Sequence, residues 1–274
     1  MKSLKQSALV LAIAGLPLSG YAELKPLHDA DMGQITGQAG VTIELETQVT
    51  IDEFTYTDEG TLGISDIFIG GADRIDMFEE FTSGRDAIFG TSSTDLIDNI
   101  KIELDVADDG DAIINVFPIT ARPVDFAVRT GAWELRGNGG ESTLLADNFS
   151  AEGLILQAQA TVDTDTDTLN LTTRFAIDEL ELDVPFMAVG IRDMRITGAG
   201  YDPDNPSLLP LFTLVDMDIY KDANAAGTDS LAIDINTFEA DMSIGQVLVG
   251  GTSIGSVGLD DLAIRNTSMR VYGH

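Results

Sequence analysis

The sequence predicts an all-β protein: an elongated antiparallel sheet, curved or sandwich-like, built of hairpin and meander repeats, with one short N-terminal helix. Three observations predict this fold class. Apolar and polar residues alternate in many segments, turn-forming residues separate those segments, and helical periodicity is almost absent. Such alternation is typical of antiparallel strands that bury one face and hydrate the other.

The first 22 residues have the pattern of a secretory signal peptide. Lys2 and Lys5 form a basic start, the short apolar run Ala8–Leu16 follows, and Gly20 and Ala22 place small residues at a cleavage site. A membrane-spanning helix needs about 20 apolar residues, and no segment of the chain reaches that length. We therefore expect an exported protein without a transmembrane span, located in the periplasm, at the outer-membrane surface or outside the cell.

Residues 23–39 are expected to form a short helix followed by a hinge. The segment 24–35 places its apolar residues near helical spacing, and a glycine follows it as a stop signal. Plain turn geometry is the alternative role for the small residues after the helix. The candidate hinge or assembly residues are Gly37, Gln38 and Gly40.

From Gly40 onward the hydrophobic period is two, which predicts one β domain over residues 40–274. Turn-forming sequences punctuate this domain and predict hairpins. A phrase that ends in glycine, with an arginine near its centre, closes each third of the domain and suggests sub-units of about 40–137, 138–200 and 211–274. The clearest alternating segments are 41–51, 100–106, 124–128 and 231–235, and the clearest turns are 57–60, 108–111, 138–140, 161–170 and 221–230, with a linker at 201–210.

The composition excludes several classes of function. The formal net charge is −31, which repels nucleic acid, so no nucleic-acid partner is expected. The chain has no cysteine, which removes disulfides, cysteine-ligated metals and a cysteine nucleophile. Its two histidines, His28 and His274, stand near the two ends of the exported chain, where they are poorly placed for a catalytic triad. We expect a protein that is not an enzyme.

One acidic segment is a candidate for calcium, and no other cofactor is expected. Asp163, Asp165 and Asp167 alternate, so an extended strand would point all three carboxylates to one side. Calcium prefers such oxygen ligands. The alternative is a solvated acidic hairpin tip that blocks edge pairing, because the spacing matches no EF-hand loop.

Two segments in which apolar residues alternate with other residues are candidates for the lining of a ligand groove. If the sheet is U-shaped or split, its dry concave face could hold a lipid or another hydrophobic molecule. The residues expected to line that groove are Leu180, Leu182, Val184, Val247 and Val249.

The start of the exported chain carries a recognisable opening. Leu24–Leu27 is followed by an Asp-Met pair at Asp31 and Met32, and then by the phrase Thr36–Ile43, which enters the first strand. This opening, D-M-G-Q-I-T-G-Q-A-G-V, resembles that of uncharacterised exported β-rich proteins of Gram-negative bacteria that are usually labelled as pilus-system proteins. The resemblance covers about twenty residues and implies a surface or pilus-associated role.

Three functions remain open at this point. The first is a structural or adhesive protein of a pilus- or fimbria-like surface system, acting through self-association or contact with other surface proteins. The second is a periplasmic or outer-membrane-associated carrier of a lipid or another hydrophobic ligand. The third is a calcium-stabilised surface domain.

Overall fold

The computed structural model describes residues 40–78 and 94–273. The chain divides into two units, Met1–Gly37 and Gln38–His274, and the first unit lies outside the described residues. The expected signal peptide and the expected helix at 24–35 also lie outside them. No helix in the described ranges is long and apolar enough to cross a membrane.

The described chain is almost entirely β-structure, as the alternation predicts. Thirteen strands form one antiparallel sheet, so the three expected sub-units share a single sheet. Two short helices accompany it, the 3-10 helix η1 (Pro185–Met187) and α3 (Leu208–Leu211). The strands are β1 (Val41–Thr47), β2 (Val49–Thr57), β3 (Thr61–Gly70), β4 (Ile97–Val106), β5 (Ala112–Pro118), β6 (Val124–Thr130), β7 (Trp133–Arg136), β8 (Ser142–Asp163), β9 (Thr168–Val184), β10 (Val189–Thr197), β11 (Thr213–Ala223), β12 (Asp229–Val249) and β13 (Thr252–Val271).

The predicted turns are confirmed. The segments 57–60, 108–111 and 138–140 connect β2 to β3, β4 to β5 and β7 to β8. The acidic segment 161–170 contains the turn between β8 and β9, and 221–230 contains the turn between β11 and β12. Glycine, asparagine and aspartate favour these positions because they tolerate turn geometry.

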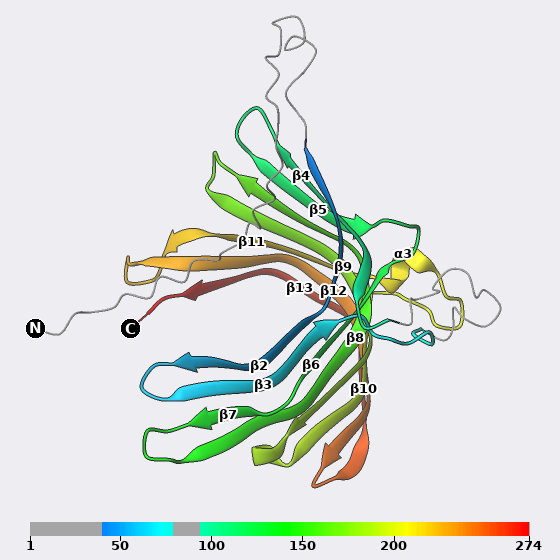
Figure 1. The fold of residues 1–274 in the computed structure, drawn as a ribbon, viewed down its shortest axis with the longest axis vertical. Helices are drawn as coiled ribbons and strands as arrows, with labels where there is room; N and C mark the ends of the chain where they lie inside the picture. The colour runs from blue at the N-terminus through cyan, green and yellow to red at the C-terminus, as the bar shows by residue number, and fades with distance from the viewer. Residues whose placement is uncertain (1–39, 79–93, 274) are drawn as a thin grey trace, which may run out of the picture. The chain divides into compact units, whose positions relative to one another are not determined.

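Four long strands, β8, β9, β12 and β13, each belong to two arms of the sheet. In the first arm, which we call the β10 arm, parts of these strands combine with β2, β3, β6, β7 and β10. In the second, the β11 arm, their other parts combine with β1, β4, β5 and β11. Figure 1 shows the β10 arm in the lower half of the view and the β11 arm in the upper half. The arms diverge because β9 pairs with β11 along its first half and with β10 along its second half.

Six Asp and Asn residues inside the described strands adopt the left-handed conformation. In β10, for example, Asp193 has φ +52°. Asp and Asn enter this region more readily than other L-residues with a side chain. The residues of this kind within strands are Asp66, Asn99, Asn148, Asp193, Asp261 and Asn266.

Each of these residues shifts the apolar alternation by one position. Val189 and Ile191 precede Asp193, whereas Met194 and Ile196 follow it. All four share one face, since Ile191 pairs with Leu182 and Met194 with Leu180, which are two residues apart in β9 and therefore point to the same side. A strand without the shift would turn its second half to the opposite face. The left-handed residues therefore keep one face apolar while they add local twist.

The buried core lies on the other face of the sheet, near the junction of the arms. Leu154 of β8 and Ala176 of β9 are fully buried there and pair with each other. Residues from the segment 71–78 and from the region of α3 complete the cluster, including Phe78 and Leu211. Burying such side chains contributes about 1.5–3 kcal/mol each. This small cluster holds the arms together and leaves the apolar face of the sheet free.

Candidate functional site

The strongest candidate site is an apolar surface on the β10 arm, built by β9, β10 and β12. Because β10 pairs with β9 on one side and β12 on the other, cross-strand partners form rows of three apolar side chains. We call these four rows the apolar face: Val184–Val189–Val249, Leu182–Ile191–Val247, Leu180–Met194–Ile244 and Ile177–Ile196–Met242.

All five residues expected to line a groove belong to this apolar face. Leu180, Leu182 and Val184 come from β9, and Val247 and Val249 come from β12. Sequence reasoning missed the strand between them, β10, which supplies the middle residue of every row. The available signal for this strand was the pair Val189 and Ile191, two apolar residues at the spacing of one face of a strand.

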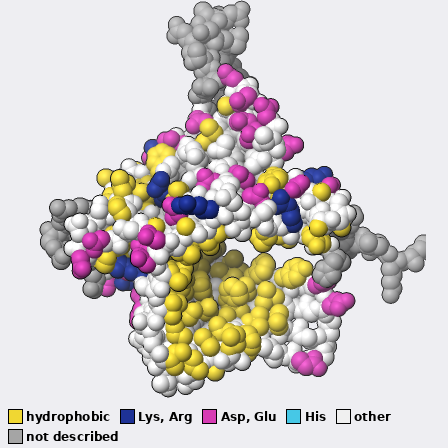
Figure 2. Space-filling model, turned by 180° about the vertical axis from the view of Figure 1, so that it is seen from behind, with side chains coloured by type: hydrophobic (Ala, Val, Ile, Leu, Met, Phe, Trp, Pro, Cys, Tyr) yellow, Lys and Arg dark blue, Asp and Glu magenta, His cyan; other side chains and the backbone are white. Residues whose placement is uncertain are grey.

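The apolar surface continues beyond the four rows. In β6, Val128 pairs with Ile69 of β3 on one side and with Ala151 of β8 on the other, and Ala151 pairs with Leu180. Figure 2 shows a hollow lined with hydrophobic side chains in the part of the molecule where Figure 1 labels β2, β3, β7 and β10. The apolar face therefore lies in a concave region of the β10 arm.

This surface is not a closed core. Of the twelve residues in the four rows, only Ile177 is buried, at 7% exposure. Val249 in the outermost row is 45% exposed, and the other five residues of the first two rows are half-buried. A contiguous apolar area that solvent reaches in this way is typical of a binding surface.

The charged side chains of the same strands occupy the opposite face, where arginines pair with carboxylates. Arg192 of β10 contacts Asp183 at 2.7 Å, and Arg129 of β6 contacts Glu152 at 2.6 Å. Desolvation of Asp183 opposes ionisation, but hydrogen bonds from Asn148 and Arg192 prevail and lower the pKa of its carboxyl group. The rows of the apolar face contain no charged residue, so the two faces differ sharply in polarity.

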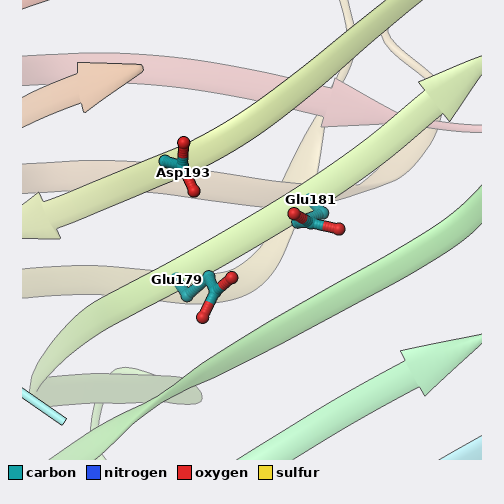
Figure 3. Close-up of side chains that lie close together, drawn as sticks. All are labelled: Glu179, Glu181 and Asp193. Atoms are coloured by element: carbon teal, nitrogen blue, oxygen red, sulfur yellow. The ribbon is translucent and has the colours of Figure 1, made fainter. Parts of the chain in front are cut away.

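An acidic cluster lies on that polar face. Figure 3 shows Glu179 and Glu181 on β9 beside Asp193 on β10, and one ligand atom from each lies within 4.8 Å of the others. Two of these carboxylates already form ion pairs with arginines: Glu179 with Arg74 at 2.9 Å and Glu181 with Arg192 at 3.9 Å. The cluster works as part of an ion-pair network that fastens the segment around Arg74 to the sheet.

The expected geometry of the calcium candidate is wrong. Residues 164–167 form a turn, so Asp163, Asp165 and Asp167 do not alternate along an extended strand. The Asp163 carboxylate accepts hydrogen bonds from the amides of Asp165 and Thr166, and hydrogen bonding to Thr166 lowers its pKa. All three residues lie in the described part of the chain, and their carboxylate oxygens do not come within 4.8 Å of one another as a group of three.

Of the three hinge candidates, Gly37 and Gln38 lie outside the described residues. Gly40 directly precedes β1, beside β4. A Cβ atom there would lie 2.1 Å from Asp105 Oδ1 and 2.9 Å from the Leu104 carbonyl oxygen. Close approach to β4 therefore requires glycine at position 40.

A family model matches the first part of the chain. Residues 1–108 match a family of unknown function, DUF6160, in agreement with the uncharacterised family expected from the N-terminal opening. The match includes β1 to β4 but not the strands that build the apolar face. No curated protein and no solved structure matches the chain.

Proposed function

We propose that the protein is an exported, non-enzymatic carrier that holds an apolar ligand, such as a lipid acyl chain, against the apolar face of the β10 arm. One observation carries the proposal: four uncharged rows of side chains lie in a hollowed region, and eleven of their twelve residues are half-buried or exposed. The signal-peptide pattern supports export, and the acidic composition keeps the outer surface soluble.

The energetics favour a long, flexible apolar ligand. Removing apolar surface from water contributes roughly 25 cal/mol per Å². A chain lying across the rows would cover Val, Leu and Ile side chains that solvent now reaches. Ligand pockets are typically concave and mostly apolar, with few polar groups, and this face meets that description.

A second candidate is a structural or adhesive role in a pilus-like system. It is favoured by exposed apolar side chains on the β11 arm, including Ile43 of β1 and Met269 of β13, which are 45% and 50% exposed. Contact between such surfaces of neighbouring copies would bury them. This candidate requires filaments or oligomers of the purified protein.

Binding of an uncharged fluorescent probe, N-phenyl-1-naphthylamine, tests the carrier function. Ile191→Asp places a carboxylate in the second row and should raise the Kd at least about tenfold, since a charge in an apolar site is strongly penalised. Ser243→Asp adds the same charge on the opposite face of β12, across from Arg195, and should leave the Kd unchanged.

Two results would contradict the carrier function. One is equal probe binding by the two variants. The other is protein purified without detergent that carries no lipid by native mass spectrometry and binds no probe. Filament formation by that clean protein would favour the structural role instead.

A further inference from the structure

Two neighbouring hairpin tips differ from all other hairpin tips in the described ranges. The tips that join β2 to β3, β4 to β5, β7 to β8, β8 to β9 and β11 to β12 contain or directly adjoin acidic residues. By contrast, the segments 184–191 and 247–259, which contain the β9–β10 and β12–β13 tips, have no charged residue. In a chain with 46 acidic residues, two uncharged tips side by side are a local exception.

The two tips are joined and present large apolar side chains to solvent. The Gly250 amide donates a hydrogen bond to the Ala188 carbonyl oxygen at 2.8 Å, which fixes one tip against the other. Phe186 and Met187 in η1 are 58% and 60% exposed, and Ile254 at the start of β13 is 69% exposed. We call residues 185–188 with 249–254 the apolar tip.

The apolar tip is continuous with the apolar face. The outermost row, Val184–Val189–Val249, directly adjoins both turns. The nearest charges belong to the polar side, where Asp183 and Arg192 form an ion pair at 2.7 Å and help to line a cavity of about 350 Å³. Apolar surface therefore runs without a charged interruption from the tip into the rows.

We propose that the apolar tip docks on a lipid bilayer whose surface carries little negative charge. Phe and Met side chains can enter the region between lipid headgroups and acyl chains, and the uncharged backbone turns bring no ionic cost. The tip has no Lys or Arg, so it lacks the attraction that anionic lipids exert on basic segments. The net charge of −31 repels an anionic surface.

This inference builds on the proposed carrier function, because docking would place the apolar face next to a source of lipid. It can nevertheless fail separately. Tip contact is measured with vesicles, whereas occupancy of the apolar face is measured with the soluble probe.

Vesicle flotation of the full exported protein tests the proposal. The protein should float with phosphatidylcholine vesicles, and the double variant Phe186→Ser/Met187→Ser should reduce the bound fraction at least about tenfold. Leu209→Ser is the matched control, since Leu209 of α3 is 72% exposed but lies outside the tip, and it should float like the wild type. Probe binding should be unchanged in both variants.

A second measurement uses the wild-type protein alone. Replacing part of the phosphatidylcholine with phosphatidylglycerol should weaken binding at low salt, and added salt should restore it by screening the repulsion. Flotation of the double variant at the wild-type level would overturn the proposal. The proposal would also be overturned if the wild-type protein bound anionic vesicles more strongly than phosphatidylcholine vesicles. The same holds if the double variant lost self-association but still bound vesicles. Vesicle binding without probe binding would retain the docking tip and refute the carrier function.

Discussion

Asp193 of β10 and Gly245 of β12 lie opposite each other where β10 shifts its alternation. Asp193 has φ +52°, and a Cβ atom on Gly245 would lie 2.8 Å from the Cβ atom of Asp193. The left-handed residue thus requires a partner without a side chain. The apolar face depends on this pair, because the shift keeps Met194 on the same side as Ile191, opposite Leu180 and Leu182 of β9.

Gly245→Ala should lower the free energy of unfolding by about 1–3 kcal/mol, the usual cost of forcing an extra methyl group into a filled site. Gly258→Ala in β13 is the control, because a Cβ atom there would meet nothing within 4 Å. Urea unfolding followed by circular dichroism measures both. Equal midpoints for the two variants would refute the steric account.

The left-handed conformation of Asn266 in β13 predicts an unusual order of substitutions. Asn266 has φ +53°. Asn266→Gly should leave the free energy of unfolding nearly unchanged, whereas Asn266→Ala should lower it by about 1 kcal/mol because alanine disfavours the left-handed conformation. Thermal and urea unfolding of the two variants checks the order. Greater stability of the alanine variant would contradict a left-handed residue at this position.

Asp234 of β12 should make the C-terminal part of β13 sensitive to acid. Hydrogen bonds from Ser268, Tyr220 and Arg270 lower the pKa of its carboxyl group to about 2. A lowered folded-state pKa stabilises the fold above the ordinary pKa of about 3.9, and this contribution disappears as the pH falls towards 2. Hydrogen exchange of β13 amides, corrected for intrinsic rates, should accelerate over that range.

Asp234→Asn is the control for this titration. The amide keeps an acceptor oxygen but does not ionise, so the variant should lose part of the protection at neutral pH and show a flatter pH dependence. An unchanged pH profile in the variant would assign the acid sensitivity to other carboxylates.

Asp125 of β6 should show the opposite pH dependence. Its side chain is buried and accepts a hydrogen bond from the Ala72 amide at 3.0 Å, and burial raises its pKa. A raised folded-state pKa means that the favourable contribution is present at low pH and is lost as the pH rises through the folded-state value. The ionised carboxylate is therefore a cost at neutral pH.

Asp125→Asn should raise the urea midpoint at pH 7, because asparagine keeps the acceptor without the charge, and the gain should vanish near pH 3. Asp165→Asn removes the same charge from an exposed turn and controls for the general relief of repulsion. If both variants gain equally, burial of Asp125 is not the cause.

Local features of the fold could be predicted well from the sequence. Turn chemistry located the hairpins, for example Asp108–Asp111 between β4 and β5, and period-two alternation located strands such as β6. The groove residues of β9 and β12 could be chosen because each alternates within its own segment. These predictions depend on a few consecutive residues.

Non-local features could not be predicted. Many apolar strands are suitable partners for β9, so its sequence does not reveal that it pairs with β11 and then with β10. Phase shifts hid the full length of β13, because Asp261 and Asn266 interrupt the alternation that defines a strand. The aspartates at 163, 165 and 167 left two interpretations open for a related reason: alternating aspartates suit a strand, but they also suit a turn whose amides they bind.

The shifts in β13 should also make its free edge a poor template for fibril formation. This strand pairs only with β12 and is largely exposed, so it could template a growing cross-β stack. Such a stack needs flat, uniformly pleated strands in register. Asp261 and Asn266 break β13 into short pleated pieces, and an incoming strand would have to follow both shifts to add to it. The two residues that keep the apolar side chains of β13 on one face should thus also make its free edge a poor seed for amyloid.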